Sequence, residues 1–181
     1  MYALPVAGVT RRVTLERPSL RRLADFLAAV RRSRRLHGAW VSPPATAAAY
    51  RAYLRRVRQP THAGYLIRHV SSGALVGVVN VSEIVRGNFQ SAYLGYYAFT
   101  PHAGQGLMAE GLALVVTDAF RRLGLHRLEA NVQPGNAASR RLVRRLGFRR
   151  EGFSPRYLTV AGRWRDHERW TILREDWRRW P

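Results

Sequence analysis

Three strand-like runs followed by a glycine loop constrain the fold of this chain more than any other feature. The runs are YLIRHV from Tyr65, ALVGVVNV from Ala74 and SAYLGYYAF from Ser91. SSG and RGN separate them, and both contain residue types that favour turns. The loop GQGLM at 104–108 follows, and apolar residues then continue at helical spacing to about Leu123. This order predicts a sheet whose third strand leads through the loop into a helix.

The segments on either side of this block add further helices and strands. Before it, VTLE at 13–16 predicts a strand, and apolar spacing predicts helices near 20–32 and 46–57. After it, HRLEANV at 126–132 predicts a strand, and PGN leads into a helix that ends near Leu146. RYLTV and RWRDHERWTIL, joined by Ala161-Gly162, predict a final hairpin. The order βαα-βββ-α-β-α-ββ predicts one mixed α/β domain over residues 1–181.

Composition excludes several classes of protein. A hydrophobic fraction of 46% is ordinary for a globular enzyme and too high for a disordered chain. No apolar run approaches the length of a membrane span, and the first residues lack the pattern of a signal peptide. The chain has no cysteine, and its 6 histidines show no metal-ligand spacing, so we expect neither disulfides nor a metal. These features predict a soluble cytoplasmic protein with no membrane partner.

The net charge of +20 comes from 31 basic residues, all of them arginine, against 11 acidic ones. A polyanionic partner such as nucleic acid, a nucleotide-like cofactor or a ribosome would explain this excess. GC-rich codon usage that spreads arginine over solvated faces explains the absence of lysine, but not the small number of acids. Both interpretations stay open, and so does direct binding of nucleic acid.

The glycine loop has the chemistry of an anion site. The N–H groups of a helix's first turn have no partner within the helix and lie at the positive end of its dipole. Gly104 and Gly106 would let a phosphate approach the backbone because neither carries a Cβ. The loop is not G-x-G-x-x-G, since residue 109 is alanine, nor a Walker loop, since G-K-[ST] is absent. A tight turn that needs positive φ angles would explain the spacing without any ligand.

A second motif follows some thirty residues later: N-x-x-S-x-x-L-x-x-x-L-G-F, from Asn136 to Phe148. With VVNVSEIVRGNFQSAYLGYYAF, GQGLMAEGL, LGFRREGF and YLTVAGRWRDH, it resembles the GCN5-related N-acetyltransferases (GNAT). The resemblance is to their Rim-type branch, the ribosomal-protein-alanine N-acetyltransferases, and above all to enzymes acting on ribosomal protein S5. It is specific from about Gly77 to Trp177 and loose over the first sixty residues. It implies the GNAT fold, a single mixed, mostly antiparallel sheet flanked by helices, with acetyl-CoA as cosubstrate.

The resemblance also implies where coenzyme A lies. Its pyrophosphate would rest on the loop backbone, and its pantetheine arm on the end of the preceding strand. Asn136 would bond the pantetheine or adenosine part, although an asparagine there also caps a helix readily. The family's loop begins with Gln or Arg and ends with Gly or Ala, whereas Ala103 and Met108 stand here, so neighbouring arginines or His102 must replace one donor. The implied cofactor-binding residues are Ala98, Phe99, Gly104, Gln105, Gly106, Leu107, Met108 and Asn136.

Acetyl transfer needs polarisation of the thioester carbonyl and a proton for the departing thiolate. A backbone N–H near Ala98 or Phe99 would hold the carbonyl. Many relatives use a tyrosine as the thiolate's acid, but Val143 stands at that position. Ser139 matches the serine that Rim-type enzymes offer in this role. A serine that merely bonds the first turn of its helix is an equal alternative.

The base that receives the amine's proton has two candidates, Glu83 and Asp166. The carboxylate that Rim-type relatives carry before YL is replaced here by Arg156. Asp166 alternates on one strand face with Glu168 and Trp170, so we expect a half-buried carboxylate. Asp166 as a structural partner of an arginine, Glu83 as a solvated strand end, and a water chain without any single base are the alternatives.

The acceptor depends most on the first two helices. His37 and Trp40 fall in the loop between them, which forms a wall of the acceptor pocket in this family; for Trp40 a core position is the simpler interpretation. The resemblance implies a protein N-terminal α-amine, ribosomal in origin, as acceptor. A small amine (antibiotic, polyamine or amino acid) is one rival, and a basic ribosome- or RNA-binding module without activity is another. The oligomeric state stays open.

Overall fold

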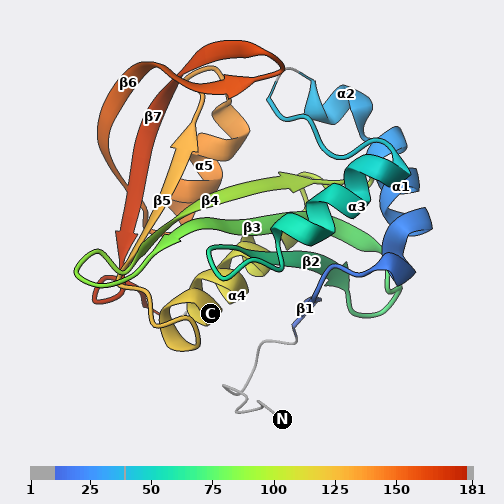
Figure 1. Ribbon diagram of the computed structural model, residues 1–181, viewed down its shortest axis with the longest axis horizontal. Helices are drawn as coiled ribbons and strands as arrows, with labels where there is room; N and C mark the ends of the chain where they lie inside the picture. The colour runs from blue at the N-terminus through green and yellow to red at the C-terminus, as the bar shows by residue number, and fades with distance from the viewer. Residues whose placement is uncertain (1–10, 39, 179–181) are drawn as a thin grey trace.

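A seven-stranded sheet in the order β1-β2-β3-β4-β5-β7-β6 forms the centre of the computed structural model, which describes residues 11–38 and 40–178 (Figure 1). Its neighbouring strands are antiparallel except for β4 and β5, which are parallel. The expected mixed, mostly antiparallel sheet is therefore confirmed. The strands are β1 (Val13–Glu16), β2 (Ala63–His69), β3 (Leu75–Val85), β4 (Ser91–Ala98), β5 (Arg127–Val132), β6 (Arg149–Val160) and β7 (Arg163–Leu173).

Helices cover both faces of the sheet. On one face, α1 and α3 pack over β2–β4 through a cluster that includes Phe26, Tyr50 and Phe99. On the other face, the apolar side of α4, including Leu112 and Val116, packs into the larger cluster. No helix within the described ranges is both long and apolar enough to cross a membrane. The helices are η1 (Leu20–Arg22, a 3-10 turn), α1 (Leu23–Arg32), α2 (Arg34–His37), α3 (Ala47–Arg56), α4 (Leu107–Arg121) and α5 (Ala137–Arg145).

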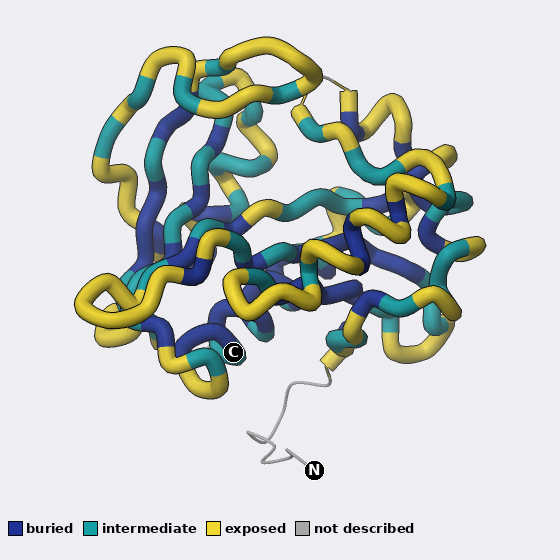
Figure 2. The backbone as a smooth tube through the Cα atoms, viewed as in Figure 1, coloured by how far each residue is buried: buried dark blue, intermediate teal, exposed yellow. Residues whose placement is uncertain are grey.

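The expected C-terminal hairpin is confirmed, but its first strand is longer than the sequence indicates. β6 begins at Arg149, and its pairing with β7 shifts register between Arg150 and Gly152 and again between Ser154 and Leu158. These irregularities accommodate glycine and proline residues whose usual preference for turns conceals the strand. Figure 2 shows that the hairpin is exposed toward its turn, whereas β2 and β3 are buried along most of their length.

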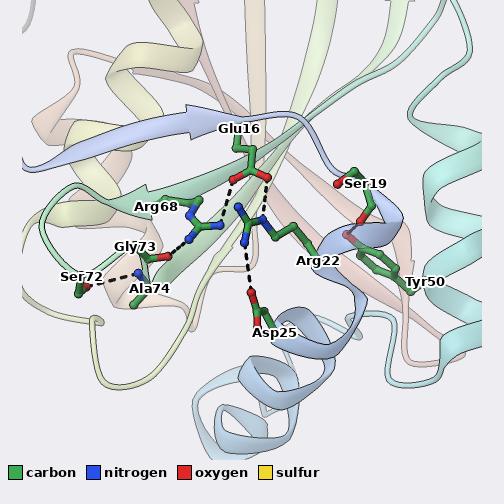
Figure 3. Close-up of polar contacts among 9 residues, drawn as sticks. All are labelled: Glu16, Ser19, Arg22, Asp25, Tyr50, Arg68, Ser72, Gly73 and Ala74. Carbon is green, nitrogen blue, oxygen red and sulfur yellow. Dashed lines mark hydrogen bonds and ion pairs between the residues drawn. The ribbon is translucent and has the colours of Figure 1, made fainter.

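Glu16 joins the helical layer to the edge of the sheet (Figure 3). Its carboxylate accepts hydrogen bonds from Arg22 Nε at 2.7 Å and from Arg68 Nη1 at 3.0 Å. The hydrogen bond from Arg22 is the main reason why the pKa of Glu16 is lowered. Nearby, the hydroxyl of Tyr50 on α3 donates to Ser19 O at 3.1 Å. These contacts fix the position of α1 and α3 over the sheet.

β4 and β5 diverge soon after they begin. Their parallel pairing consists of Ser91 with Arg127, Ala92 with Leu128 and Tyr93 with Glu129, after which the strands separate (Figure 1). We call the point defined by Tyr93 and Glu129 the fork. Beyond it, no strand among the described residues pairs with β4 on its β5 side, so the polar backbone groups there are available to a ligand.

Candidate active site

The glycine loop leaves the N-terminus of α4 open. Gly104 and Gly106 both have positive φ, 81° and 78°, and Gly106 is the N-cap residue. The N–H groups of Ala109 and Glu110 return to Gly106 O, at 3.0 and 3.2 Å. Within the described residues, no hydrogen-bond partner is recorded for the N–H groups of Leu107 and Met108. The loop thus has both the backbone conformation of a tight turn and the free donors of an anion site.

Arg12 supplies a cation at this loop. Its Nη2 would lie 3.4 Å from a Cβ placed on Gly106, and its Nε lies 2.7 Å from Glu110 Oε1 in the first turn of α4. The expectation that a neighbouring arginine assists the loop therefore has a specific candidate, which the sequence did not identify because Arg12 lies far away along the chain. His102 instead stacks on His69, and burial lowers its pKa, as do the charges of His69 and Arg32, so it is a poorer anion partner.

Met108 fits the loop because its side chain leaves the helix N-terminus. A Cβ on Gly77 of β3 would collide with the Met108 sulfur, so this side chain lies on the sheet surface over Gly77. A methionine where the family pattern has glycine or alanine therefore does not cover the open N–H groups. The backbone approach to Gly104 is also free of the rest of the described chain, none of whose atoms lies within 4 Å of a Cβ placed there.

The hydrogen bonds of β4 decide which of its groups face the space beyond the fork. Phe99 N–H donates to Val76 O of β3 at 2.7 Å. Because bonded and non-bonded pairs alternate in an antiparallel ladder, Tyr97 and Gly95 also bond β3, whereas Tyr96 and Ala98 direct their N–H groups toward β5. The expectation that Phe99 N–H holds the thioester carbonyl is wrong, since that group belongs to the sheet. Tyr96 and Ala98 are the available donors.

His37 closes one side of this strand end. Its Nε2 lies 2.9 Å from Ala98 O, and since a carbonyl only accepts, Nε2 carries the proton. His37 is buried at 5% exposure, and burial lowers its pKa, which keeps the ring neutral. Its ring also lies edge-on to Tyr97, with centroids 5.4 Å apart. His37 therefore occupies the carbonyl of Ala98 and leaves the N–H of that residue to a ligand.

A hydroxyl group on β4 and one on α5 lie within hydrogen-bond distance of each other. Tyr96 Oη on β4 and Ser139 Oγ on α5 are 2.6 Å apart, and either can donate. Burial raises the pKa of Tyr96 to about 12, so its hydroxyl stays protonated at neutral pH. Asn136 fixes Ser139 because its Oδ1 accepts the Ser139 N–H at 3.0 Å. The capping role of Asn136 is thus confirmed, and the Ser139 side chain remains free for the contact with Tyr96.

The structure does not bring either expected base to this hydroxyl pair. Glu83 lies in a bulge of β3 with its side chain 69% exposed, and its carboxylate is 3.7 Å from His62, on the β2 side of the strand. Asp166 is exposed, which corrects the expectation of a half-buried carboxylate. The face of β7 that carries Asp166 extends past the helices toward the hairpin turn, so the side chain is not covered there. Asp166 Oδ1 accepts the Arg156 N–H at 2.7 Å. Either role as base stays a prediction.

A third carboxylate lies at the fork itself. Glu129 is the β5 residue that pairs in register with Tyr93, and its side chain is only 18% exposed. The Tyr93 hydroxyl is hydrogen-bonded to Tyr157 of β6, and this bond, together with burial and the charge of Glu129, raises the pKa of Tyr93 to about 12. The sequence does not reveal this group because its members come from three different strands. The RLEA run of β5 was visible, but nothing in it indicated a neighbour on β4.

Trp40 connects the loop after α2 to the loop after β5. Its ring would lie 3.1 Å from a Cβ on Gly135, and its carbonyl accepts a hydrogen bond from Gln133 Nε2 at 3.3 Å. At 39% exposure it is not a core residue, so the simpler interpretation is wrong. Trp40 instead lies against the loop between β5 and α5, and its role as a wall of the acceptor pocket stays a prediction. The described residues hold no cluster of three or more metal-ligating side chains.

With this geometry in place, comparison with known proteins identifies the class. Residues 12–149 match the family described as acetyltransferase (GNAT) domain, so the chain belongs to this family. It is an acetyltransferase, and acetyl-CoA is its cosubstrate. The glycine loop, the open N-terminus of α4 and the free N–H groups of β4 fit the phosphates and the amide-bearing arm of that molecule.

Among individual proteins, the chain is similar to "Probable N-acetyltransferase YjcK" of Bacillus subtilis, with 37% identity over 124 residues, 68% of either chain. It is also similar to the [ribosomal protein uS5]-alanine N-acetyltransferase of Escherichia coli, with 41% identity over 103 residues. This second match covers 57% of the chain and 53% of the Escherichia coli protein.

Solved structures agree on the fold. Mycobacterium smegmatis RimJ in complex with CoA-disulfide superposes with a TM-score of 0.83 and 26% identity, covering 90% of this chain and 82% of that one. Spermidine N-acetyltransferase from Vibrio cholerae, in complex with CoA and spermine, gives a TM-score of 0.77 over 92% of this chain and 98% of that one. At 20% identity the second likeness shows the fold alone.

Proposed function

We propose that this acetyltransferase acts on the α-amine of a protein N-terminus, with a ribosomal protein as the acceptor. The observation that carries the proposal is the 41% identity to the uS5-alanine enzyme over 103 residues. The net charge of +20 supports it, because ribosomal particles and acidic peptides are attracted to such a surface. Free polyamines and cationic antibiotics are repelled by it.

In the proposed complex, backbone groups hold the cosubstrate, which supplies an activated acetyl thioester. The N–H groups of Leu107 and Met108, with Gly104 and Gly106 before them, bind the pyrophosphate, and Arg12 adds a charge beside them. The N–H of Ala98 binds the pantetheine arm and that of Tyr96 the thioester carbonyl. Asn136 contributes its amide nitrogen, since its oxygen already caps α5.

Protons move through side chains on the two sides of the fork. Ser139 Oγ donates a proton to the departing sulfur and regains one from Tyr96, whose hydroxyl is 2.6 Å away. The amine of the acceptor substrate loses its proton on the other side of the fork. There Glu129, with Tyr93 and Tyr157 beside it, is the proton acceptor closest to the fork. One proton leaves nitrogen for Glu129 and one joins sulfur from the Ser139–Tyr96 pair; Glu129 then releases its proton to solvent and the hydroxyl pair regains one from solvent, so the transfer balances.

The rival acceptor is a polyamine, as in the Vibrio cholerae neighbour. A direct test incubates the protein with acetyl-CoA and a mixture of ribosomal proteins, followed by intact-mass spectrometry and N-terminal peptide sequencing. The proposal expects one or a few proteins to gain 42 Da, the mass of one acetyl group, at the N-terminal residue. Acetylation of spermidine or spermine with no labelled N-terminus would contradict it.

A further inference from the structure

One face of the β5–β7–β6 half-sheet carries two half-buried arginines, Arg165 and Arg169. Asn131 of β5 pairs in register with Arg169 of β7, and Arg165 lies further along the same face toward the hairpin turn. The opposite face packs on α5, where Glu168 lies 3.2 Å from Arg140. The face with Arg165 and Arg169 is therefore the one turned away from α5.

This face is continuous with the fork. His167 lies between the two arginines on β7, and its ring is edge-on to Tyr157 with centroids 6.3 Å apart. Tyr157 in turn bonds the hydroxyl of Tyr93, the last β4 residue paired with β5. A molecule bound over Arg165 and Arg169 can thus reach the fork from the side opposite to α4 and α5.

The carboxylates near this face are already engaged. Glu129 accepts from Arg127 Nε at 2.9 Å, and Glu151 binds the same guanidinium and accepts from Thr171 at 3.0 Å. The charge of Arg169 helps to lower the pKa of Glu151, but Arg127 has the larger effect. Asp166 accepts a backbone N–H in the hairpin.

Arg165 and Arg169 themselves are half-buried, and neither takes part in an ion pair recorded for residues 11–38 and 40–178. The Nε atoms of both are buried without a hydrogen-bond partner, and so is Oδ1 of Asn131. A buried polar atom without a partner costs about 1–3 kcal/mol, and a partly buried cation attracts an anion. A guanidinium group is complementary to a carboxylate, which it can bind through two parallel N–H donors.

We infer that Arg165, with Arg169 further along the same face of β7, binds a carboxylate of the acceptor close to the reacting amine. The inference rests on the proposed function and narrows it to acceptors with an acidic group in their first residues. A polyamine has no carboxylate, and the same two arginines repel it.

The test compares alanine-started peptides that differ only in the second residue: aspartate, asparagine or lysine. We expect kcat/KM to be about tenfold higher for the aspartate peptide than for the asparagine peptide. Arg165→Gln removes this preference, and Arg165→Glu reverses it in favour of the lysine peptide. Arg141→Gln, which removes the same charge from an exposed position on α5, keeps it. Unchanged acetyl-CoA affinity in calorimetry shows that each variant is folded.

The possible outcomes separate this inference from the proposed function. Equal rates for all three peptides would overturn the carboxylate site and leave the N-terminal acceptor intact. A preference for aspartate that survives in Arg165→Gln/Arg169→Gln would overturn the site as well. If free alanine is acetylated faster than any peptide and loses this advantage in Arg165→Gln, the site is supported and the protein acceptor is wrong. Acetylation of spermine alone would overturn both.

Discussion

The two sides of the fork are built from different parts of the chain. On the α4–α5 side, which we assign to the cosubstrate, the site consists of backbone N–H groups at Gly106–Met108 and a helix cap at Asn136. On the other side, which we assign to the acceptor, it consists of side chains such as Tyr157 and Arg165 from separate strands. Backbone sites follow from a few adjacent residues, whereas side-chain sites depend on how distant segments assemble.

The largest effect is expected from a substitution that disrupts only the α4–α5 side of the fork, where backbone N–H groups form the site. Gly106→Asp places a Cβ and a negative charge where phosphate is expected, at φ 78°. We expect coenzyme A affinity to fall by about a hundredfold or more, because the phosphates lose their donors and meet a like charge. Isothermal calorimetry measures the affinity, and circular dichroism confirms the fold.

Gly162→Asp is the matched control for that variant. Gly162 also has positive φ, 74°, with nothing within 4 Å of a Cβ, but it lies in the β6–β7 turn. The Gly162→Asp variant has the same added charge and the same backbone strain as Gly106→Asp, but away from the loop. Its affinity for coenzyme A should therefore equal that of the parent protein. Equal affinity in Gly106→Asp and Gly162→Asp would mean that GQGLM is only a turn.

The second prediction concerns the hydroxyl pair that links the two sides. Ser139→Ala should lower kcat by about ten- to a thousandfold while the KM for acetyl-CoA changes little, because the departing sulfur loses its proton donor. Tyr96→Phe should lower kcat less, and the double variant should be no worse than Ser139→Ala. Steady-state kinetics of all three variants decide this, and a normal kcat in Ser139→Ala would reduce Ser139 to a helix-capping residue.

The third prediction distinguishes three carboxylates. Glu129→Gln should lower kcat/KM for the acceptor by about a hundredfold near neutral pH and make it rise more steeply with pH, because without a proton acceptor at the fork only the amine that is already neutral in solution reacts. Glu83→Gln and Asp166→Asn remove carboxylates that lie away from the Tyr96–Ser139 pair, and each should retain most of the activity. Rate–pH profiles of the three variants provide the measurement.

Glu151→Gln controls for a purely structural effect of Glu129, since both carboxylates bind Arg127. If Glu151→Gln reproduces both the loss of rate and the altered pH profile, Glu129 acts only by holding Arg127. A full loss in Glu83→Gln or Asp166→Asn instead would restore the base expected from the sequence.

The difference between the two sides also explains what the sequence could predict. The order of strands along the chain, the hairpin turn at Ala161-Gly162 and the glycine turn before α4 follow from local patterns, and the structure confirms each. The contact of Arg12 with the loop and that of Tyr157 with Tyr93 join segments far apart in the chain, and no local pattern encodes them. Phe99 was assigned wrongly for a similar reason, because the alternation of N–H groups depends on the register with β3.

The smallest expected effect is on stability and concerns His37. Burial lowers the pKa of His37 in the folded protein, so the unfolded chain binds this proton more tightly. The contribution of His37 to the stability of the folded protein is therefore complete above about pH 6.5 and is lost as the pH falls below that value. His37→Gln keeps a donor for Ala98 O but does not titrate, so its stability should fall less steeply between pH 6.5 and 5.

The expected difference in slope is at most about 1.4 kcal/mol per pH unit, the value for one proton. His102 and His167 also have lowered pKa values, mainly through burial, so part of the slope remains in the variant. Urea denaturation at several pH values measures it. Equal slopes in His37→Gln and the parent would contradict the assignment.

The most direct test of the two-sided fork is a crystal structure with a bisubstrate conjugate, coenzyme A joined through its sulfur and an acetyl bridge to the N-terminal nitrogen of an acidic peptide. The account predicts pyrophosphate oxygens within hydrogen-bond distance of the Leu107 and Met108 N–H groups, and the bridge carbonyl on Tyr96 N–H. It also predicts the peptide carboxylate against Arg165. A peptide that lies on the α4–α5 side, or a pyrophosphate away from Gly104–Met108, would contradict the account.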